Sequence, residues 1–315
     1  FAILLIIHNG VTYLPMFQFG GSVGNTDLQN CIIRSQRYLY DLKNPNLVFI
    51  GSSLTARIRT KLLPGSVFNL AYPCLSGMTG LSIVEKKTEA PKVLVIQLNQ
   101  MLNLDPLLID DVLSPASYIP KKYLRALRQE FRPTSILRFI FGSLTGSKGQ
   151  LDDWYLPQKI DLSSGEPLRL SQESIAQTYV DAQSMPKVNY DISKEVRSSL
   201  EQNVREQYEL FFLKDGTSYI DTPLFSKRVT EFRQKLMDLK SKGTRVYFNQ
   251  MPLDRANENF EIYVHYVKRI RDMFANETFI YVQSEDFSYT DGLHLDDRSA
   301  VLYTKELSKQ LNLDQ

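Results

Sequence analysis

Ser53 and His294 are the two residues of this sequence that could together perform nucleophilic chemistry. His294 stands in the run Asp291-Gly292-Leu293-His294-Leu295, in a chain with only three histidines in 315 residues. An Asp three residues before a His can orient the imidazole through one ring nitrogen, which leaves the other nitrogen to take a proton. Ser53 follows an apolar run, residues 47–50, that stops at a glycine and a serine. A hydroxyl released at the end of a buried strand is a candidate nucleophile.

Five apolar runs predict the strands that must position these side chains: residues 47–50, 67–70, 93–98, 245–248 and 279–282. Near-continuous hydrophobicity is typical of strands that are buried on both faces of a parallel sheet. Helical patterns lie between them, such as 79–87 and 226–242, and the second closes with lysines and Gly243. Strands alternating with helices predict an α/β fold with a doubly wound, mostly parallel five-stranded sheet flanked by helices.

Polar side chains collect after these runs, where ligands of doubly wound sheets bind, outside the carboxyl ends of the strands. The residues concerned are Ser52, Ser53, Asn69, Asn99, Asn249, Gln250, Asp291 and His294. Any single Asn here is better explained as a turn residue at the end of a strand. Taken together and in this order, the residues predict a functional site at one edge of the sheet.

The composition is that of an ordinary globular protein, 43% hydrophobic and 23% charged. The 37 basic and 35 acidic residues give a net charge of +2 without a basic stripe, which argues against a nucleic-acid partner. Three scattered histidines and two distant cysteines provide too few ligands for a metal site, so we expect neither metal nor cofactor. Cys31 and Cys74 are either two buried thiols or one disulfide in an oxidising compartment.

The first seven residues are all apolar, and His8-Asn9-Gly10 then interrupts the run. Three interpretations compete: the outer end of an anchor helix, the remnant of an uncleaved signal sequence, and a buried strand. We expect residues 1–24 to be the end of an N-terminal membrane anchor and a linker. Residues 25–315 then form a catalytic domain outside the cytoplasm, on the periplasmic or extracellular face.

Residues 104–191 break the alternation of strand and helix with seven prolines, so we expect an inserted, helical segment. Within it, residues 121–141 mix Lys and Arg with aromatic and aliphatic residues. Such a basic amphipathic segment suits an anionic membrane surface or a membrane partner. It equally suits a cap helix that buries its apolar side while its basic side chains are solvated.

Four short motifs occur in the order of the sequence blocks of a known family. They are Gly51-Ser52-Ser53-Leu54, Asn69-Leu70-Ala71 running into Ser76-Gly77, Gln97-Leu98-Asn99-Gln100 and Asp291-Gly292-Leu293-His294. In these motifs the chain resembles the SGNH (GDSL-like) hydrolases and acyltransferases, from about residue 47 to residue 311 without the insertion. The resemblance implies a three-layer, flavodoxin-like fold.

Carried over residue by residue, the resemblance implies that Ser53 is the nucleophile, His294 the base and Asp291 the residue that orients it. It also implies an oxyanion hole formed by the N–H of Ser53, a backbone N–H of Cys74 or Gly77, and the side-chain amide of Asn99. Removing one such preorganised donor typically slows acyl transfer by about 100-fold to 1000-fold.

The chain departs from the family pattern at Ser52, where the common motif has Asp, at Cys74, near the usual glycine, and at Gln100, which replaces an Asp. The Gly-Ser-Ser variant resembles an extracytoplasmic branch that includes teichoic acid D-alanyl-transfer proteins and polysaccharide O-acyltransferases. Members of that kind often receive their acyl group from a multi-spanning membrane acyltransferase. We therefore expect an O-acyltransferase, most plausibly O-acetyl, that acts on a polysaccharide or cell-envelope glycan.

Two other functions stay open: a carbohydrate esterase or deacetylase of the same family, and a non-catalytic glycan-binding or scaffold protein. At the residue level, Ser53 also suits the N-cap of a helix over residues 54–63. His265 has helical spacing and is expected to be a packing or surface residue. His8 has no acidic neighbour in the sequence.

Overall fold

Five parallel strands form the central sheet, in the order β2-β1-β3-β6-β7. Their bounds are β1 Leu47–Gly51, β2 Val67–Ala71, β3 Val93–Gln97, β6 Arg245–Gln250 and β7 Thr278–Tyr281. Each predicted strand is present within two residues of its expected ends. The predicted doubly wound, parallel α/β sheet is therefore confirmed.

The computed structural model describes, by residue number, 8–9, 12, 27–43, 45–72, 77–99, 101–132, 158, 160–161, 164, 166–167, 169–199, 202, 223–254 and 261–313. Three features predicted from the sequence lie outside these ranges: Cys74, most of the expected anchor and linker at 1–24, and residues 133–141 of the basic segment. Within these ranges, no helix is long and apolar enough to cross a membrane.

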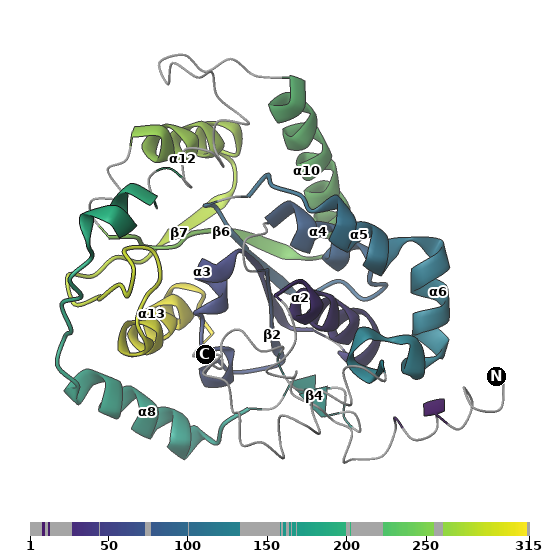
Figure 1. Ribbon diagram of the computed structural model, residues 1–315, viewed down its shortest axis with the longest axis horizontal. Helices are drawn as coiled ribbons and strands as arrows, with labels where there is room; N and C mark the ends of the chain where they lie inside the picture. Colours follow the sequence, from purple (N-terminus) through teal and green to yellow (C-terminus); the bar gives the residue numbers. More distant parts are fainter. Residues whose placement is uncertain are drawn as a thin grey trace.

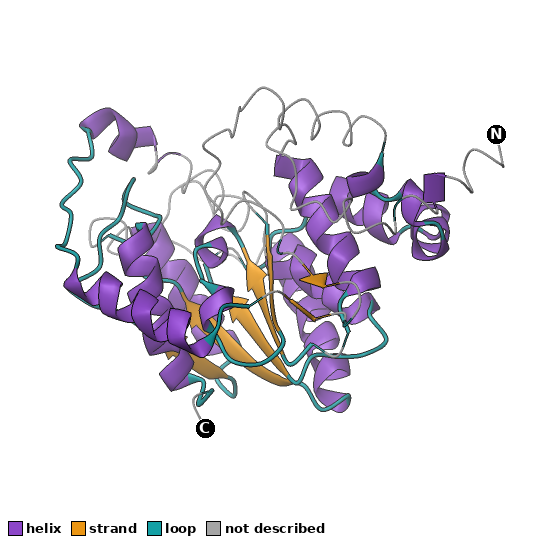
Figure 2. Cartoon of the chain, turned by 90° about the horizontal axis from the view of Figure 1, so that it is seen from below, coloured by secondary structure: helices purple, strands orange, loops and turns teal. Residues whose placement is uncertain are grey.

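Helices cover both faces of the sheet, which gives three layers (Figures 1 and 2). On one face lie α2 Asp27–Gln36, α4 Gly77–Lys86, α10 Pro223–Ser241 and α12 Glu261–Met273. On the other lie the short α3 Ser53–Ala56 and α13 Asp297–Gln310, with α8 Gln172–Ser184 packed against α13. The central strands β1 and β3 are buried at every position, which explains why their sequences are continuously apolar.

The predicted insertion contributes to the layers instead of forming a separate body. Its first helix, α5 Pro106–Leu113, buries Leu108 and Val112 in the main core. Asp105 caps this helix by accepting a hydrogen bond from the N–H of Leu108 at 3.1 Å. Next come α6 Pro115–Tyr123 and the two-stranded pair β4 Ile160–Asp161 and β5 Glu166–Pro167. The insertion therefore helps to build the core.

The basic segment is not one helix, because α6 ends at Tyr123 and two 3-10 turns follow, Arg125–Leu127 and Gln129–Phe131. Three of its basic side chains, Lys121, Arg125 and Arg128, are buried. The expectation of solvated basic side chains is thus wrong for these three, and burial equally keeps them from an anionic surface.

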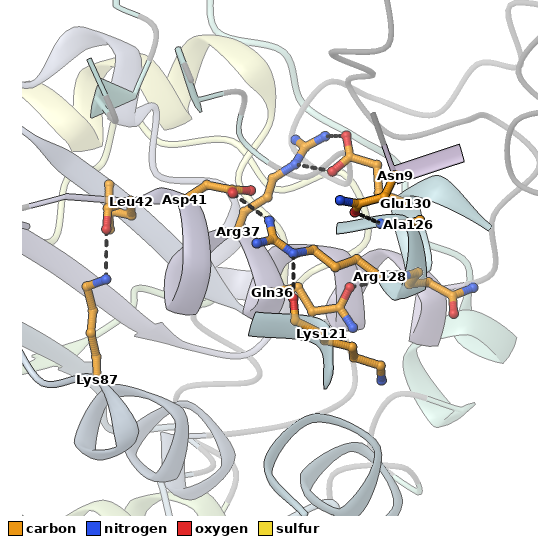
Figure 3. A network of polar contacts seen from close by, with 11 residues as sticks. Asn9, Gln36, Arg37, Asp41, Leu42, Lys87, Lys121, Ala126, Arg128 and Glu130 are labelled. Atoms are coloured by element: carbon orange, nitrogen blue, oxygen red, sulfur yellow. Dashed lines mark hydrogen bonds and ion pairs between the residues drawn. The ribbon is translucent and has the colours of Figure 1, made fainter. Parts of the chain in front are cut away.

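Carboxylates and main-chain groups hold two buried arginines, Arg128 and Arg37, in place (Figure 3). Arg128 donates to the carboxylate of Asp41 at 2.6 Å, and Arg37 pairs with Glu130. Asn9 contacts the same turns: its side-chain oxygen accepts from the N–H of Ala126 at 3.1 Å. Charge pairing across distant elements therefore explains the burial of Arg128 and Arg37.

Candidate active site

Ser53 is placed by the sharp turn that joins β1 to α3. It is the first residue of α3 and is half-buried, whereas its neighbours Ser52 and Leu54 are buried. The helix cap is Ser52, whose hydroxyl accepts from the N–H of Leu54 at 3.4 Å. The expected N-cap role of Ser53 is therefore filled by Ser52, and α3 ends at Ala56, well short of residue 63. The hydroxyl of Ser53 is left to other partners.

His294 and Asp291 stand in a tight loop between β7 and α13. An isolated bridge pairs Tyr289 with Leu295, and the N–H of Thr290 donates to the carbonyl of His294 at 2.9 Å. Gly292 at the tip has a φ of +86°, a conformation that L side chains rarely adopt. The sequence Asp-Gly-Leu-His therefore reverses the chain in few residues and brings Asp291 back to His294.

The three predicted catalytic residues form one hydrogen-bonded chain. The hydroxyl of Ser53 lies 2.8 Å from Nε2 of His294, and Nδ1 of His294 lies 2.7 Å from Oδ2 of Asp291. The second oxygen, Oδ1 of Asp291, accepts from the N–H of Leu293 at 3.0 Å and of His294 at 2.8 Å. One carboxylate thus fixes both the loop and the imidazole, and 241 residues of sequence separate Ser53 from its base.

The charge of Asp291 is stabilised by its partners. Burial alone would raise its pKa, but the ring of His294 and the N–H groups of His294 and Leu293 lower the pKa to about 2. The carboxylate is therefore ionised throughout the pH range in which a histidine acts as a base. An ionised Asp291 can stabilise an imidazolium at His294, the charge that a histidine gains when it takes a proton from a serine.

The predicted oxyanion donors differ in what the structure offers. Within the described part of the chain no acceptor bonds the N–H of Ser53, and the same holds for the N–H of Gly77 at the start of α4. Gly77 packs against the backbone of Met101 at the same edge of the sheet, where an added Cβ would lie 3.0 Å from the carbonyl oxygen of Met101. Cys74 lies outside the described residues.

The side-chain amide of Asn99, the third predicted oxyanion donor, is bonded to other protein groups. Its amide nitrogen donates to the hydroxyl of Tyr263 at 2.9 Å and to the carbonyl of Met251 at 3.4 Å, and its Oδ1 accepts from the N–H of Met251 at 3.1 Å. The physical reason is burial: Asn99 is 2% exposed, so its polar atoms pair with Met251, just after β6, and with Tyr263 of α12. In this conformation Asn99 links the end of β3 to Met251 and Tyr263, and both of its amide donors are used there.

Gln97, the last residue of β3, belongs to the third sequence motif, but the sequence predicted no role for it. It is 2% exposed and bonds the turn that carries Ser53. Its signal in the sequence was a polar residue at the end of an otherwise apolar strand. Asn249, its register partner on β6, bonds instead to the hydroxyl of Tyr303 at 2.8 Å and belongs to the packing of α13.

An open groove of about 700 Å³ lies beside the loop that carries Asp291 and His294, which we call the catalytic loop. It lies between residues 187–192 and the loop 283–289 that leads into Asp291. Tyr190, Tyr289, Asn189 and Gln283 are among its lining residues. Asp254, also in its wall, donates its N–H to the carbonyl of Gly292 at 3.1 Å. The groove and the catalytic loop therefore share a wall.

The other two histidines stand apart from Ser53, His294 and Asp291. Nε2 of His8 lies 3.0 Å from the carbonyl of Phe131, and His265 is a half-buried residue of α12. Among the described residues no group of three or more His, Cys, Asp and Glu is placed to hold a metal ion.

Comparison with known proteins assigns no family to this chain. The chain matches no protein-family model, and it has no significant match among curated proteins or solved structures. The resemblance to the SGNH hydrolases and acyltransferases thus rests on the four short motifs, and functional arguments rest on the geometry of the site.

Proposed function

We propose that this chain is a serine-dependent O-acyltransferase that transfers a short acyl group, acetyl in the first instance, to a hydroxyl of an exported polysaccharide or cell-envelope glycan. The observation that carries the proposal is the hydrogen-bonded chain Ser53, His294 and Asp291. A nucleophile bonded to a base that is oriented by a carboxylate is the arrangement that acyl transfer through an acyl-serine requires.

The reaction proceeds in two halves. The Ser53 hydroxyl oxygen attacks the acyl carbon while Nε2 of His294 takes the hydroxyl proton, and Asp291 balances the positive charge of the imidazolium. Collapse of the tetrahedral intermediate expels the leaving group, which receives the proton from His294 and leaves acyl-Ser53. In the second half His294 takes the proton of the acceptor hydroxyl, the acceptor oxygen takes the acyl group, and Ser53 recovers its proton.

The N–H of Ser53 is the donor that best suits the oxyanion, with the N–H of Gly77 as the second. Both lack an acceptor within the described part of the chain, and both lie at the strand-end edge of the sheet. A preorganised N–H that makes no other bond costs no reorganisation when the negative charge develops. Asn99 would have to break its bond to Tyr263 before it could join them.

The groove beside the catalytic loop supports transfer to a large acceptor. Tyr190, 41% exposed, offers an aromatic face, and Asn189 and Gln283 offer amide groups that can bond hydroxyls. An open groove with aromatic and amide walls suits a hydroxyl-rich chain better than a small apolar ligand, which needs an enclosed pocket.

The place of action belongs to the same proposal. The apolar first residues and the Gly-Ser-Ser motif support a membrane-anchored protein whose catalytic domain lies outside the cytoplasm. A multi-spanning membrane acyltransferase would then supply the acyl group. Such a partner is needed because the small-molecule acyl donors are cytoplasmic metabolites that do not cross the membrane unaided.

Hydrolysis is the second candidate, and solvent exposure favours it. Side chains of Asp291 and His294 are 38% and 18% exposed, so water reaches the edge of the site. If water replaces the glycan hydroxyl in the second half of the reaction, the protein is an esterase or deacetylase. A non-catalytic glycan-binding or scaffold role would leave the bond between Ser53 and His294 without a use.

The test is intact-protein mass spectrometry of the full chain after exposure to p-nitrophenyl acetate, with Ser53→Ala alongside. We expect one acetyl adduct that maps to Ser53, is absent in the variant, and is discharged faster by added oligosaccharide than by water. Discharge by water alone would replace the transferase with an esterase. In cells, normal glycan acylation by Ser53→Ala would refute the catalytic role.

A further inference from the structure

Gln97 occupies a position from which one side chain reaches the whole turn around Ser53. It ends β3, the strand next to β1, and Ile50 and Ile96 are register partners just before the two strand ends. Its side chain is buried and therefore shielded from water, so its amide must bond to protein groups. The partners that it finds are all in the turn.

The amide of Gln97 makes five hydrogen bonds to two residues. Its Oε1 accepts from the N–H of Ser52 at 2.8 Å, the hydroxyl of Ser52 at 3.1 Å, the hydroxyl of Thr55 at 2.6 Å and the N–H of Thr55 at 3.3 Å. Its Nε2 donates to the hydroxyl of Ser52 at 2.9 Å. These contacts hold the residue before Ser53 and the residue two after it.

Gly51 makes this approach possible. A Cβ at position 51 would lie 2.5 Å from both Cβ and Oε1 of Gln97 and would also collide with the hydroxyl of Thr55. The backbone of β1 therefore approaches the amide as closely as it does only because residue 51 has no side chain. The glycine of the Gly-Ser-Ser motif and Gln97 fit each other.

The bonds of Gln97 also decide which backbone donors remain. In the turn, the N–H of Ser52 and of Thr55 are taken by Gln97, and that of Leu54 is taken by the hydroxyl of Ser52. The N–H of Ala56 donates to the carbonyl of Ser52. The N–H of Ser53 is left, on the residue whose hydroxyl faces His294.

We propose that Gln97 is the positioning residue of this site: its buried amide fixes the turn from β1 to α3 so that Ser53 presents its hydroxyl to His294 and its N–H to the oxyanion. This role rests on the proposed acyl-transfer function. Gln97 touches no reacting atom and acts through Ser52 and Thr55. Asn69 supports the same turn from the other side, since its amide nitrogen donates to the carbonyl of Thr55 at 2.8 Å.

Two substitutions distinguish a role of Gln97 in positioning the turn from a role in filling space in the core. Gln97→Met keeps the length of the side chain but removes both polar atoms. Gln97→Glu keeps the oxygen that accepts from Ser52 and Thr55, and the hydroxyl of Ser52 can turn to donate to the new carboxylate. The matched control is Asn249→Leu, which removes an equally buried amide at the paired position of the next strand without touching the turn.

The first readout is the rate at which p-nitrophenyl acetate acylates Ser53 in the full chain, measured against ester concentration. For Gln97→Met we expect the limiting rate to fall by about 100-fold, as displacements of about 1 Å at a reacting group do, with the half-saturating concentration unchanged. Gln97→Glu should recover at least about a tenth of the wild-type rate, and Asn249→Leu should acylate at nearly the full rate while losing as much stability as Gln97→Met.

The second readout is hydrogen exchange of the Ser52 and Thr55 N–H groups. It reports the hydrogen bonds of these groups to Gln97 independently of the acylation rate. We expect both to be protected in the wild type and in Gln97→Glu, and to exchange much faster in Gln97→Met. Unchanged exchange or an unchanged acylation rate in Gln97→Met would refute the positioning role, as would an equal loss of rate in Asn249→Leu. A wild type with protected amides but no acylation at Ser53 would refute the proposed function instead.

Discussion

At the scale of single residues, Asp291 does most to define the chemistry. One of its oxygens holds Nδ1 of His294, and the other closes the loop by accepting from two N–H groups. The imidazole is thereby fixed with Nε2 toward Ser53. Neutralising this carboxylate should therefore impair the base more than it disturbs the fold.

We predict that Asp291→Asn slows acylation of Ser53 by about 10⁴-fold, the loss typical of an Asp-to-Asn change in a Ser-His-Asp triad, because the amide favours the wrong tautomer. The measurement is the single-turnover acylation rate with an activated acetyl ester. Asp272→Asn, at an exposed position of α12, is the control and should keep the wild-type rate. An equal rate in both variants would remove Asp291 from the mechanism.

The lowered pKa of Asp291 also predicts a pH dependence of stability. Its folded-state pKa of about 2 lies below the ordinary value of 3.8, so the unfolded state binds the proton more readily. The stabilisation is then fully present above about pH 4 and is lost as the pH falls toward 2. Denaturant unfolding of wild type and Asp291→Asn should show a difference in the free energy of unfolding that shrinks over this window. A difference that stays constant from pH 7 to pH 2 would contradict the assignment.

At the scale of elements, the turn between β1 and α3 depends on the missing side chain of Gly51. We predict that Gly51→Ala lowers the free energy of unfolding by about 1–3 kcal/mol, as overpacking of a buried site does, because its Cβ meets Gln97 and Thr55. In the same variant Ser53 should be acylated more slowly, since the side chain of Gln97 is displaced from the turn. Wild-type stability and rate in Gly51→Ala would show that the turn tolerates the added methyl group.

The buried ion pair between Arg37 and Glu130 of the insertion gives a second prediction at this scale. Arg37 and Glu130 have side chains that are 5% and 7% exposed, so removing one charge leaves the other buried and uncompensated. We predict that Glu130→Met lowers the free energy of unfolding by about 3–5 kcal/mol. Glu306→Gln, which breaks the exposed pair with Lys309, should cost less than about 1 kcal/mol. Equal small losses in both variants would mean that the buried pair is dispensable.

At the scale of the whole molecule, the sequence predicted the sheet and the catalytic chain but not the contacts between distant elements. Continuous apolar runs predict buried parallel strands. The local pattern Asp-Gly-Leu-His predicts the loop around Gly292. The pairing of Arg128 with Asp41 joins segments 87 residues apart, and no local pattern reveals such a partner. Without knowledge of such distant partners, the basic segment was expected to be solvated or to lie at a membrane. In the same way, the amide of Asn99 was expected to be available to the oxyanion, because its bonds to Met251 and Tyr263 cannot be read from the sequence.

The groove beside the catalytic loop gives the prediction that concerns the acceptor. We expect Tyr190→Ala to slow discharge of acetyl-Ser53 by oligosaccharide by about fivefold, since a stacked aromatic ring contributes on the order of 1 kcal/mol, and to leave discharge by water unchanged. Tyr123→Ala, which removes a still more exposed ring on α6, is the control. Equal discharge by oligosaccharide in both variants would move the acceptor to another surface.

The most direct measurement of the central claim is the rate at which an alkyl fluorophosphonate labels the full chain, followed by intact mass and peptide mapping. The reagent forms a phosphorus–oxygen bond with an activated serine and releases fluoride, so it needs no glycan and no acyl donor. The account predicts a single adduct on Ser53, none in Ser53→Ala, and labelling at least about 100-fold slower in His294→Ala, because a general base contributes that much or more. Absence of an adduct on Ser53, or a rate that does not depend on His294, would contradict it.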